Sequence, residues 1–215
     1  MRAAAAAALL AVLTAGAPAA RADFATGFAA FQAGRYPQAL KALRPAAEAG
    51  DKRAQYLLGR MYRDGLGVKP NMGTAVTWLR RAADGPDADR YALHDLAVLY
   101  ERGRGVKRDL KRAVALYRRA AERGVAAAML NLGVLLARGQ GVERDLPEGL
   151  RLVYRAYEAG EPQAGRAFDT LARSAERDPP VAGRWRAVAY AGPADDPNLR
   201  DPAGVARLAL GTELR

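Results

Sequence analysis

Apolar and small residues recur through the middle of the chain with the spacing of a helix. Between residues 54 and 62 they fall at i, i+3, i+4, i+7 and i+8, which places them on one face of an amphipathic helix. These positions are Ala54, Leu57, Leu58, Met61 and Tyr62. The equivalent positions further along are Ala92, Asp95, Leu96, Leu99 and Tyr100, then Ala128, Asn131, Leu132, Leu135 and Leu136. The pattern predicts three equivalent helices, each with one face buried.

A Gly-x-Gly-Val phrase follows each of these helices and sets the length of the repeat. It begins at Gly65, Gly103 and Gly139, at spacings of 38 and then 36 residues. Self-similarity at a period of about 20 to 50 residues is the signature of a stacked repeat protein. Two extra residues near Gly85 account for the longer first spacing.

Each glycine turn leads into a second amphipathic helix. A residue whose side-chain oxygen can accept from the free N–H groups of a helix start precedes each one. These capping residues are Asn71, Asp109 and Asp145. In the first helices one position is always very small, which predicts the point where two helix backbones approach closely. The small residues are Gly59, Ala97 and Gly133.

The combined pattern, A-x3-L-G-x2-Y-x2-G-x-G-V followed by a cap, resembles the Sel1-like repeat, a relative of the tetratricopeptide repeat. Three units match it, over residues 51–88, 89–124 and 125–160. Departures from it are mild: Asn71, Ala97, Leu136 and Gly149. The resemblance implies an all-α fold, a right-handed superhelical solenoid of antiparallel helix pairs.

The segments that flank the three units fit a capped stack. Residues 23–50 resemble a tetratricopeptide-like helix pair, and residues 161–177 predict a final helix that covers the last unit. Beyond residue 178 the pattern fails and prolines accumulate. We expect residues 178–215 to form a mostly extended tail. Within it, Trp185, Val188 and Tyr190 could dock on the stack, and residues 205–210 could form a short helix.

Residues 1–22 have the organisation of a cleavable signal peptide. A positive start at Arg2 is followed by an apolar run over residues 3–13 and by the small-residue site Ala20-Arg21-Ala22. The run is shorter than the roughly 20 residues of a membrane span. We predict cleavage after Ala22 and a periplasmic or secreted protein. The alternative is an alanine-rich amphipathic leader or a retained anchor.

The composition argues against most catalytic chemistry. The chain has no cysteine and a single histidine, His94, which leaves no thiol nucleophile and no ordinary zinc site. The Gly-x-Gly turns follow helices, so they lack the strand context of a dinucleotide site. We expect no catalytic, cofactor or metal site. Sel1-like proteins linked to β-lactam chemistry are cysteine-rich, unlike this chain, and an envelope hydrolase is the least favoured function.

The chain is basic, with 34 Lys and Arg against 23 Asp and Glu and a net charge of +11. Clusters occur at Arg80-Arg81, Lys107-Arg108, Lys111-Arg112 and Arg118-Arg119. They are either solvated helix faces or an attraction for an anionic envelope polymer or membrane surface. Export disfavours nucleic acid as a partner.

The resemblance also places a candidate binding site, because first helices line the concave groove in tetratricopeptide proteins. The groove positions are Tyr56, Arg60, Arg63, His94, Val98, Glu101, Leu130 and Val134. They change from Tyr and Arg to Leu and Val, which suggests a partner segment with acidic and apolar parts. Alternatively, the tail or the next helix covers Leu130 and Val134. The leading prediction is a monomeric, non-enzymatic exported scaffold or regulator that binds a protein.

Overall fold

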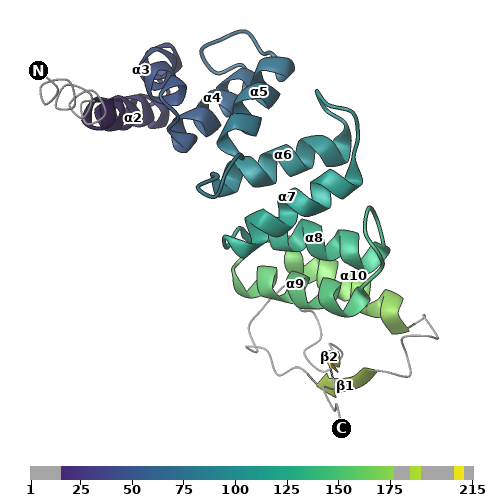
Figure 1. Cartoon of the computed structure of the whole chain (residues 1–215). Coiled ribbons are helices and arrows are strands. Elements are labelled where there is room, and N and C mark those ends of the chain that lie inside the picture. The colour runs from purple at the N-terminus through teal and green to yellow at the C-terminus, as the bar shows by residue number, and fades with distance from the viewer. Residues whose placement is uncertain (1–15, 177–184, 190–205, 211–215) are drawn as a thin grey trace, which may run out of the picture. The chain divides into compact units, whose positions relative to one another are not determined.

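A computed structural model describes residues 16–176, 185–189 and 206–210 of the chain (Figure 1). The chain divides into two compact units, Met1–Arg108 and Asp109–Arg215.

Unit 1 is a series of antiparallel helices. They are α2 (Gly16–Gln32), α3 (Tyr36–Glu48), α4 (Lys52–Asp64), α5 (Met72–Ala82) and α6 (Arg90–Arg102). Each helix packs on the next one along the chain, and α2 also contacts α4. The first helices of successive pairs are therefore neighbours, as stacking of helical hairpins requires.

Unit 2 continues the same pattern. Its helices are α7 (Leu110–Glu122), α8 (Ala126–Arg138), α9 (Leu146–Glu158) and α10 (Ala164–Glu176). Helix α10 packs on both α8 and α9, and its Ala164 and Leu171 are buried. The predicted all-α helical-repeat fold is confirmed.

The predicted helix caps are present. Asn71 accepts a hydrogen bond from the backbone N–H of Thr74, Asp109 from that of Arg112, and Asp145 from that of Glu148. The first helices end in left-handed glycines, Gly65, Gly103 and Gly139, with φ of 72°, 67° and 65°. These are conformations that favour glycine over any other residue. Local backbone chemistry thus sets where each helix begins and ends.

The small position of the first helix is the predicted point of close contact. A Cβ added to Gly59 would lie 2.8 Å from Leu79 Cγ on α5. In unit 2 a Cβ on Gly133 would lie 2.6 Å from the carbonyl oxygen of Gly149 on α9. Larger side chains at these positions would force the paired helices apart.

Two arginines near the glycine turns bind helix ends. Arg108 Nε donates to the carbonyl of Glu101 at 3.0 Å, and Arg144 Nε donates to the carbonyl of Ala137 at 3.0 Å. A cation at a helix C-terminus satisfies free carbonyls and opposes the negative end of the helix dipole. Arg108, read from the sequence as part of a basic cluster, therefore also has a structural role.

The C-terminal segment contains two strands that the sequence did not predict. β1 (Trp185–Ala189) pairs antiparallel with β2 (Ala206–Leu210), with Trp185 opposite Leu210. The possibility of a short helix over residues 205–210 is wrong. So short a helix is marginal, whereas pairing with a second strand satisfies the same backbone groups. Tyr190 and Val205 lie outside the described residues, and docking of the tail on the stack stays a prediction.

At the N-terminus, α2 begins before the predicted cleavage point, which lies inside the helix. Residues 1–15, which hold most of the predicted signal peptide, lie outside the described part of the chain. None of the helices that the structure describes is long and apolar enough to cross a bilayer.

Candidate functional site

The first helices of unit 1 present a surface of aromatic rings and arginines. We call it the aromatic–arginine face, and it consists of Phe28, Phe31, Tyr56, Arg60 and Tyr91. The rings of Tyr56 on α4 and Tyr91 on α6 stack, with centroids 6.0 Å apart and planes inclined by 28°. The Arg60 guanidinium lies 5.5 Å from the Phe31 ring centroid and 5.9 Å from that of Tyr56. One arginine thus bridges rings from α2 and α4.

Two members of this face are unusually open to solvent. Phe28 is 38% exposed and Tyr91 is 45% exposed, and these are the exposed large apolar side chains in the described part of the chain. Exposed aromatic residues beside arginine are enriched where proteins bind one another. Phe28 lies on α2 and Tyr91 on α6, and the α4 members of the face, Tyr56 and Arg60, come between them in the chain.

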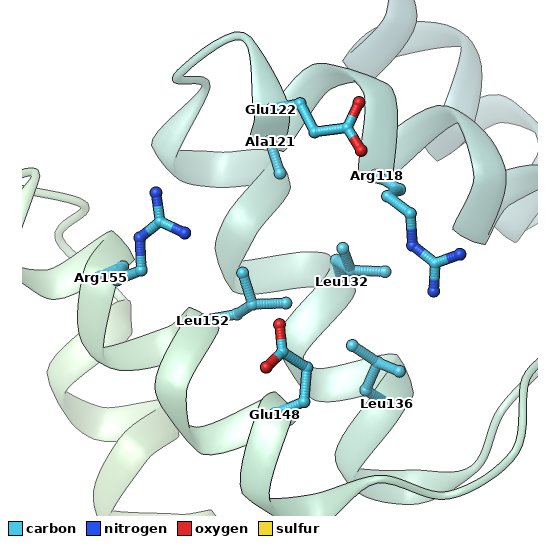
Figure 2. A pocket seen from close by; sticks show the side chains of 8 residues that line it. All are labelled: Arg118, Ala121, Glu122, Leu132, Leu136, Glu148, Leu152 and Arg155. Carbon is cyan, nitrogen blue, oxygen red and sulfur yellow. The ribbon is translucent and has the colours of Figure 1, made fainter.

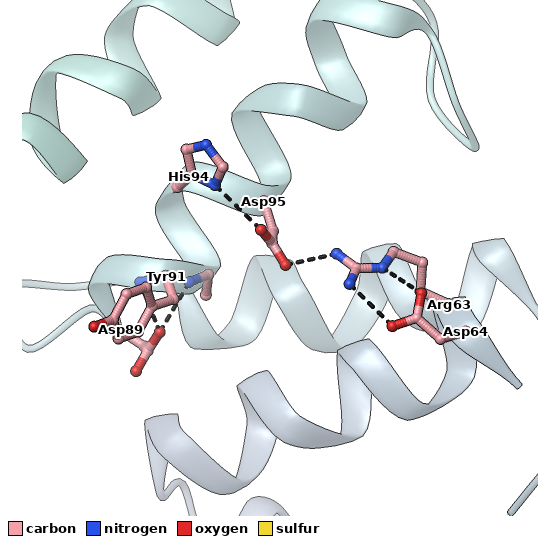
Figure 3. A network of polar contacts seen from close by, with 7 residues as sticks. Arg63, Asp64, Asp89, Tyr91, His94 and Asp95 are labelled. Atoms are coloured by element: carbon pink, nitrogen blue, oxygen red, sulfur yellow. Dashed lines mark hydrogen bonds and ion pairs between the residues drawn. The ribbon is translucent and has the colours of Figure 1, made fainter. Parts of the chain in front are cut away.

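A polar network lies beside this face and joins α4 to α6 (Figure 3). Arg63 Nη1 donates to Asp95 Oδ2 at 2.6 Å, while its Nε and Nη2 donate to Asp64 at 2.8 and 3.0 Å. His94 Nδ1 lies 3.2 Å from Asp95 Oδ1. Two of the predicted groove residues, Arg63 and His94, therefore converge on Asp95.

The network is partly buried and keeps its charges. Burial acts to raise the pKa of Asp95, but the hydrogen bond to His94 and the charge of Arg63 hold that pKa below its usual value. The hydrogen bond to Asp64, followed by the charge of Asp95, raises the pKa of Arg63 despite the opposing effect of burial. Burial, with a smaller effect from Asp95, raises the pKa of Tyr56 to about 12. The Tyr56 hydroxyl is therefore neutral at physiological pH.

The position of Tyr91 is set by the start of α6. Asp89 caps this helix and accepts from the backbone N–H groups of Tyr91 and Ala92 at 2.9 and 2.8 Å. Burial raises the pKa of the Asp89 carboxyl, although these hydrogen bonds act to lower it. The cap fixes Tyr91 in the first turn, from which its ring reaches Tyr56.

The eight predicted groove residues have different surroundings. Tyr56 and Arg60 belong to the aromatic–arginine face, and Arg63 and His94 belong to the network. Val98 and Glu101 are half-buried on α6, as is Val134 on α8 in unit 2. Leu130, also on α8, is buried, with 7% of its surface exposed.

Sequence reasoning missed Phe28, Tyr91 and Asp95. The groove positions were assigned at fixed spacings from the small position of each first helix, and none of these spacings reaches Tyr91 at the start of its helix. Sequence reasoning also placed Asp95 on the buried stripe, where its equivalent in the first unit is the buried Leu57. An acidic residue on an apolar stripe was the available signal, because such a residue needs a partner.

Within the described ranges, no group of three His, Asp or Glu side chains lies close enough together to hold a metal ion.

Comparison with known proteins agrees with the repeat pattern. The model of the Sel1 repeat family matches residues 52–87, 90–125 and 126–161. A Sel1 repeat protein from Oxalobacter formigenes is 31% identical, with a TM-score of 0.64, over 72% of this chain and 61% of that one. A search of curated proteins finds no match.

A second solved structure is c5321, described as a protective antigen present in uropathogenic Escherichia coli strains that displays an SLR fold. It is 31% identical, with a TM-score of 0.65, over 74% of this chain and 34% of that protein. The chain thus spans less than two thirds of the length of either protein. Sel1 repeat proteins are typically scaffolds for protein–protein interaction and are generally not enzymes. With three matched repeats, each built from the helices described above, the chain belongs to the Sel1 repeat family.

Proposed function

We propose that the chain is a non-enzymatic, exported scaffold or regulator that binds a segment of a protein partner on the aromatic–arginine face of unit 1. The observation that carries this proposal is the exposed Tyr91 ring stacked on Tyr56 beside Arg60. Aromatic rings offer large contact area for little loss of conformational freedom. They are the usual anchors of protein interfaces.

The charges beside the rings define the chemistry of the partner. Within the described part of the chain, the Arg60 guanidinium contacts aromatic rings and has no carboxylate partner. A carboxylate of the partner can therefore pair with it, and an apolar or aromatic side chain can pack on Tyr91. Arg63 is different because Asp64 and Asp95 already hold its guanidinium. It supports the face and is a poor candidate for direct contact.

The basic clusters support an anionic polymer or membrane surface less well. Arg80 donates to the Tyr100 hydroxyl at 2.9 Å, and Arg81 lies 4.8 Å from the Trp78 ring centroid. Arg108 is bound to the end of α6. Several cluster arginines thus have partners inside the fold. Binding to an anionic polymer or membrane through exposed charges would weaken as the salt concentration rises, because salt screens such charges. Binding of a protein partner on the aromatic–arginine face would be much less sensitive to salt.

Crosslinking in the cell envelope tests the protein-binding proposal. A photoreactive phenylalanine analogue at position 91 should capture one dominant protein. Arg60→Glu should remove that crosslink, while the matched control Arg104→Glu, an exposed arginine in the turn after α6, should keep it. Circular dichroism checks that both variants fold. Capture that persists in Arg60→Glu, or no captured protein at all, would refute this site.

Export is tested separately. We expect the chain recovered from the envelope to begin at Asp23, because cleavage after Ala22 fits the small-residue site. Intact-mass measurement of the recovered protein gives the answer. A chain that retains residues 1–22 would overturn the cleavage while leaving the binding face untouched.

A further inference from the structure

A tyrosine and an arginine recur as a pair in unit 1. The tyrosine lies three residues after the small position of the first helix, and the arginine comes from the preceding second helix. Arg44 Nη2 on α3 donates to the Tyr62 hydroxyl at 3.0 Å. Arg80 Nη2 on α5 donates to the Tyr100 hydroxyl at 2.9 Å. The pair links one hairpin to the next in both places.

The third repeat keeps the arginine and lacks the tyrosine. Arg118 on α7 has the register of Arg44 and Arg80, since each follows a fully buried alanine by five residues. The tyrosine position is Leu136. In the described part of the chain, the Arg118 side chain has neither a hydrogen-bond acceptor nor a carboxylate partner.

A second aromatic residue is also replaced by a smaller one. In the first repeat the buried Trp78 lies three residues after Ala75 on the second helix. The corresponding residue in the third repeat is Leu152, three residues after Gly149 on α9. Two large rings in the first repeat therefore correspond to two leucines in the third.

These substitutions coincide with an open cavity of about 240 Å³ within unit 2 (Figure 2). Three leucines and an alanine form its apolar part, and charged side chains surround them. The lining residues are Arg118, Ala121, Glu122, Leu132, Leu136, Glu148, Leu152 and Arg155. The volume is below the range of about 300 to 1,000 Å³ that is usual for drug-sized ligands, and it suits one side chain.

The polar groups of the cavity select among possible side chains. Glu148 is paired with Arg151, whereas Glu122 lies one turn from Arg118 on α7 and has no ion-pair partner among the described residues. A group placed between Arg118 and Glu122 must accept from the arginine and donate to the carboxylate. A phenol hydroxyl does both. A carboxylate would be repelled by Glu122, and a plain ring would satisfy neither charge.

We propose that this cavity binds the tyrosine side chain of a partner protein. The ring packs on Leu132, Leu136 and Leu152, and the hydroxyl lies between Arg118 and Glu122. In unit 1, Tyr62 and Tyr100 of the chain itself pair with the arginine. In unit 2, a tyrosine of the partner protein takes that place. This docking point lies in unit 2 and does not depend on the aromatic–arginine face.

Leucine-methyl NMR of the full chain tests the proposal with a defined probe. The probe is the blocked pentapeptide acetyl-Ala-Ala-Tyr-Ala-Ala-amide, and the control has Phe in place of Tyr. We expect saturable shifts of the Leu132, Leu136 and Leu152 methyls. The Tyr peptide should bind about fivefold more tightly, the ratio that corresponds to one net hydrogen bond of about 1 kcal/mol.

Two variants separate the ring from the hydroxyl. Leu136→Tyr should fill the cavity, pair with Arg118 and abolish binding of both peptides, with a thermal midpoint at or above that of the parent. Arg118→Gln should reduce the preference for Tyr over Phe and leave binding of the ring in place. Arg166→Gln, an exposed arginine on α10 that does not line the cavity, should change nothing.

Three results would overturn the proposal. They are unshifted methyls, equal affinity for the Tyr and Phe peptides, and unchanged binding in Leu136→Tyr. Should Leu136→Tyr fail to fold, Arg118→Gln alone decides, because its side chain is exposed. p-Cresol is a parallel probe. If it binds and the Tyr peptide does not, the cavity takes a small free phenol and not a protein side chain.

Discussion

Arg63 on α4 reaches Asp95 on α6 with a contact of 2.6 Å, and the two side chains are only 25% and 16% exposed. The pair joins the first helices of two successive repeats. One member of the pair, Arg63, is a residue that the sequence placed in the binding groove. A variant of Arg63 would therefore disturb the stack as well as any partner, which makes Arg60 the better residue for testing binding.

The Arg63–Asp95 pair should show energetic coupling. Arg63→Met leaves a largely buried carboxylate with one charged partner fewer, and we expect a loss of about 2 kcal/mol in the free energy of unfolding. Asp95→Asn should cost less, because the amide can still accept from Arg63. The double variant should cost less than the sum of the two, with a coupling of about 0.5 to 3 kcal/mol.

Urea denaturation of the four proteins of this cycle measures the coupling. Arg104→Met is the control, and it should lie within about 0.5 kcal/mol of the parent because Arg104 is an exposed turn residue. Additive losses in the cycle would contradict a direct interaction between Arg63 and Asp95.

Asp95 should make the fold sensitive to acid. Its pKa in the folded protein is below the usual value of 3.8. The stabilisation is therefore complete above the unfolded pKa and is lost as the pH falls through the folded pKa. The stability difference between the parent and Asp95→Asn should be constant at neutral pH and shrink below about pH 4. Thermal midpoints measured from pH 7 to pH 2.5 give this difference, and one that is independent of pH would contradict the prediction.

The contribution of Asp89 to stability should depend on pH in the opposite direction. Its pKa in the folded protein is raised above 3.8, so its contribution to stability falls as the pH rises through that range. Asp89→Asn keeps a good capping residue and removes the buried charge, and it should be neutral or stabilising at pH 7. Asp89→Ala loses the cap and should cost about 1 kcal/mol. Urea midpoints of the two variants at pH 7 compare them, and equal losses would contradict the assignment of Asp89 as a cap.

The sequence was most informative where the physics is local. Capping at Asn71 and Asp109, and the left-handed turn at Gly65, depend only on backbone groups within a few residues. A short motif therefore reveals them. The small position at Gly59 was equally predictable, because a small residue recurs at this position in every unit. These features predicted the fold and its helix ends.

Features that depend on contacts between residues far apart in the sequence could not be predicted. Helical periodicity put Asp95 on a buried stripe but could not show that Arg63, 32 residues earlier, would face it. The pairing of β1 with β2 is non-local in the same way. The substitution of Leu136 for tyrosine was visible and looked harmless as one apolar residue for another. Its consequence depends on Arg118 in the adjacent helix.

The close contact of α8 with α9 makes a graded prediction about glycine. A Cβ on Gly133 would lie 2.6 Å from the Gly149 carbonyl, a backbone atom that cannot yield, so Gly133→Ala should cost about 1 to 3 kcal/mol. Gly59→Ala should cost less, because its obstacle is the Leu79 side chain at 2.8 Å, which can change rotamer. A Cβ on Gly73 would meet only Asn71 Oδ1, at 3.5 Å, which is an ordinary contact distance. Gly73→Ala should therefore stabilise α5 by about 0.5 to 1 kcal/mol.

Urea midpoints of the three alanine variants test this order directly. Because Gly133 and Gly149 face each other, Gly149→Ala should also destabilise the protein, and the double variant should cost less than the sum. The first methyl already separates α8 from α9 and leaves room for the second. A fully additive pair, or a Gly133→Ala as stable as Gly73→Ala, would show that α8 and α9 are not in backbone contact.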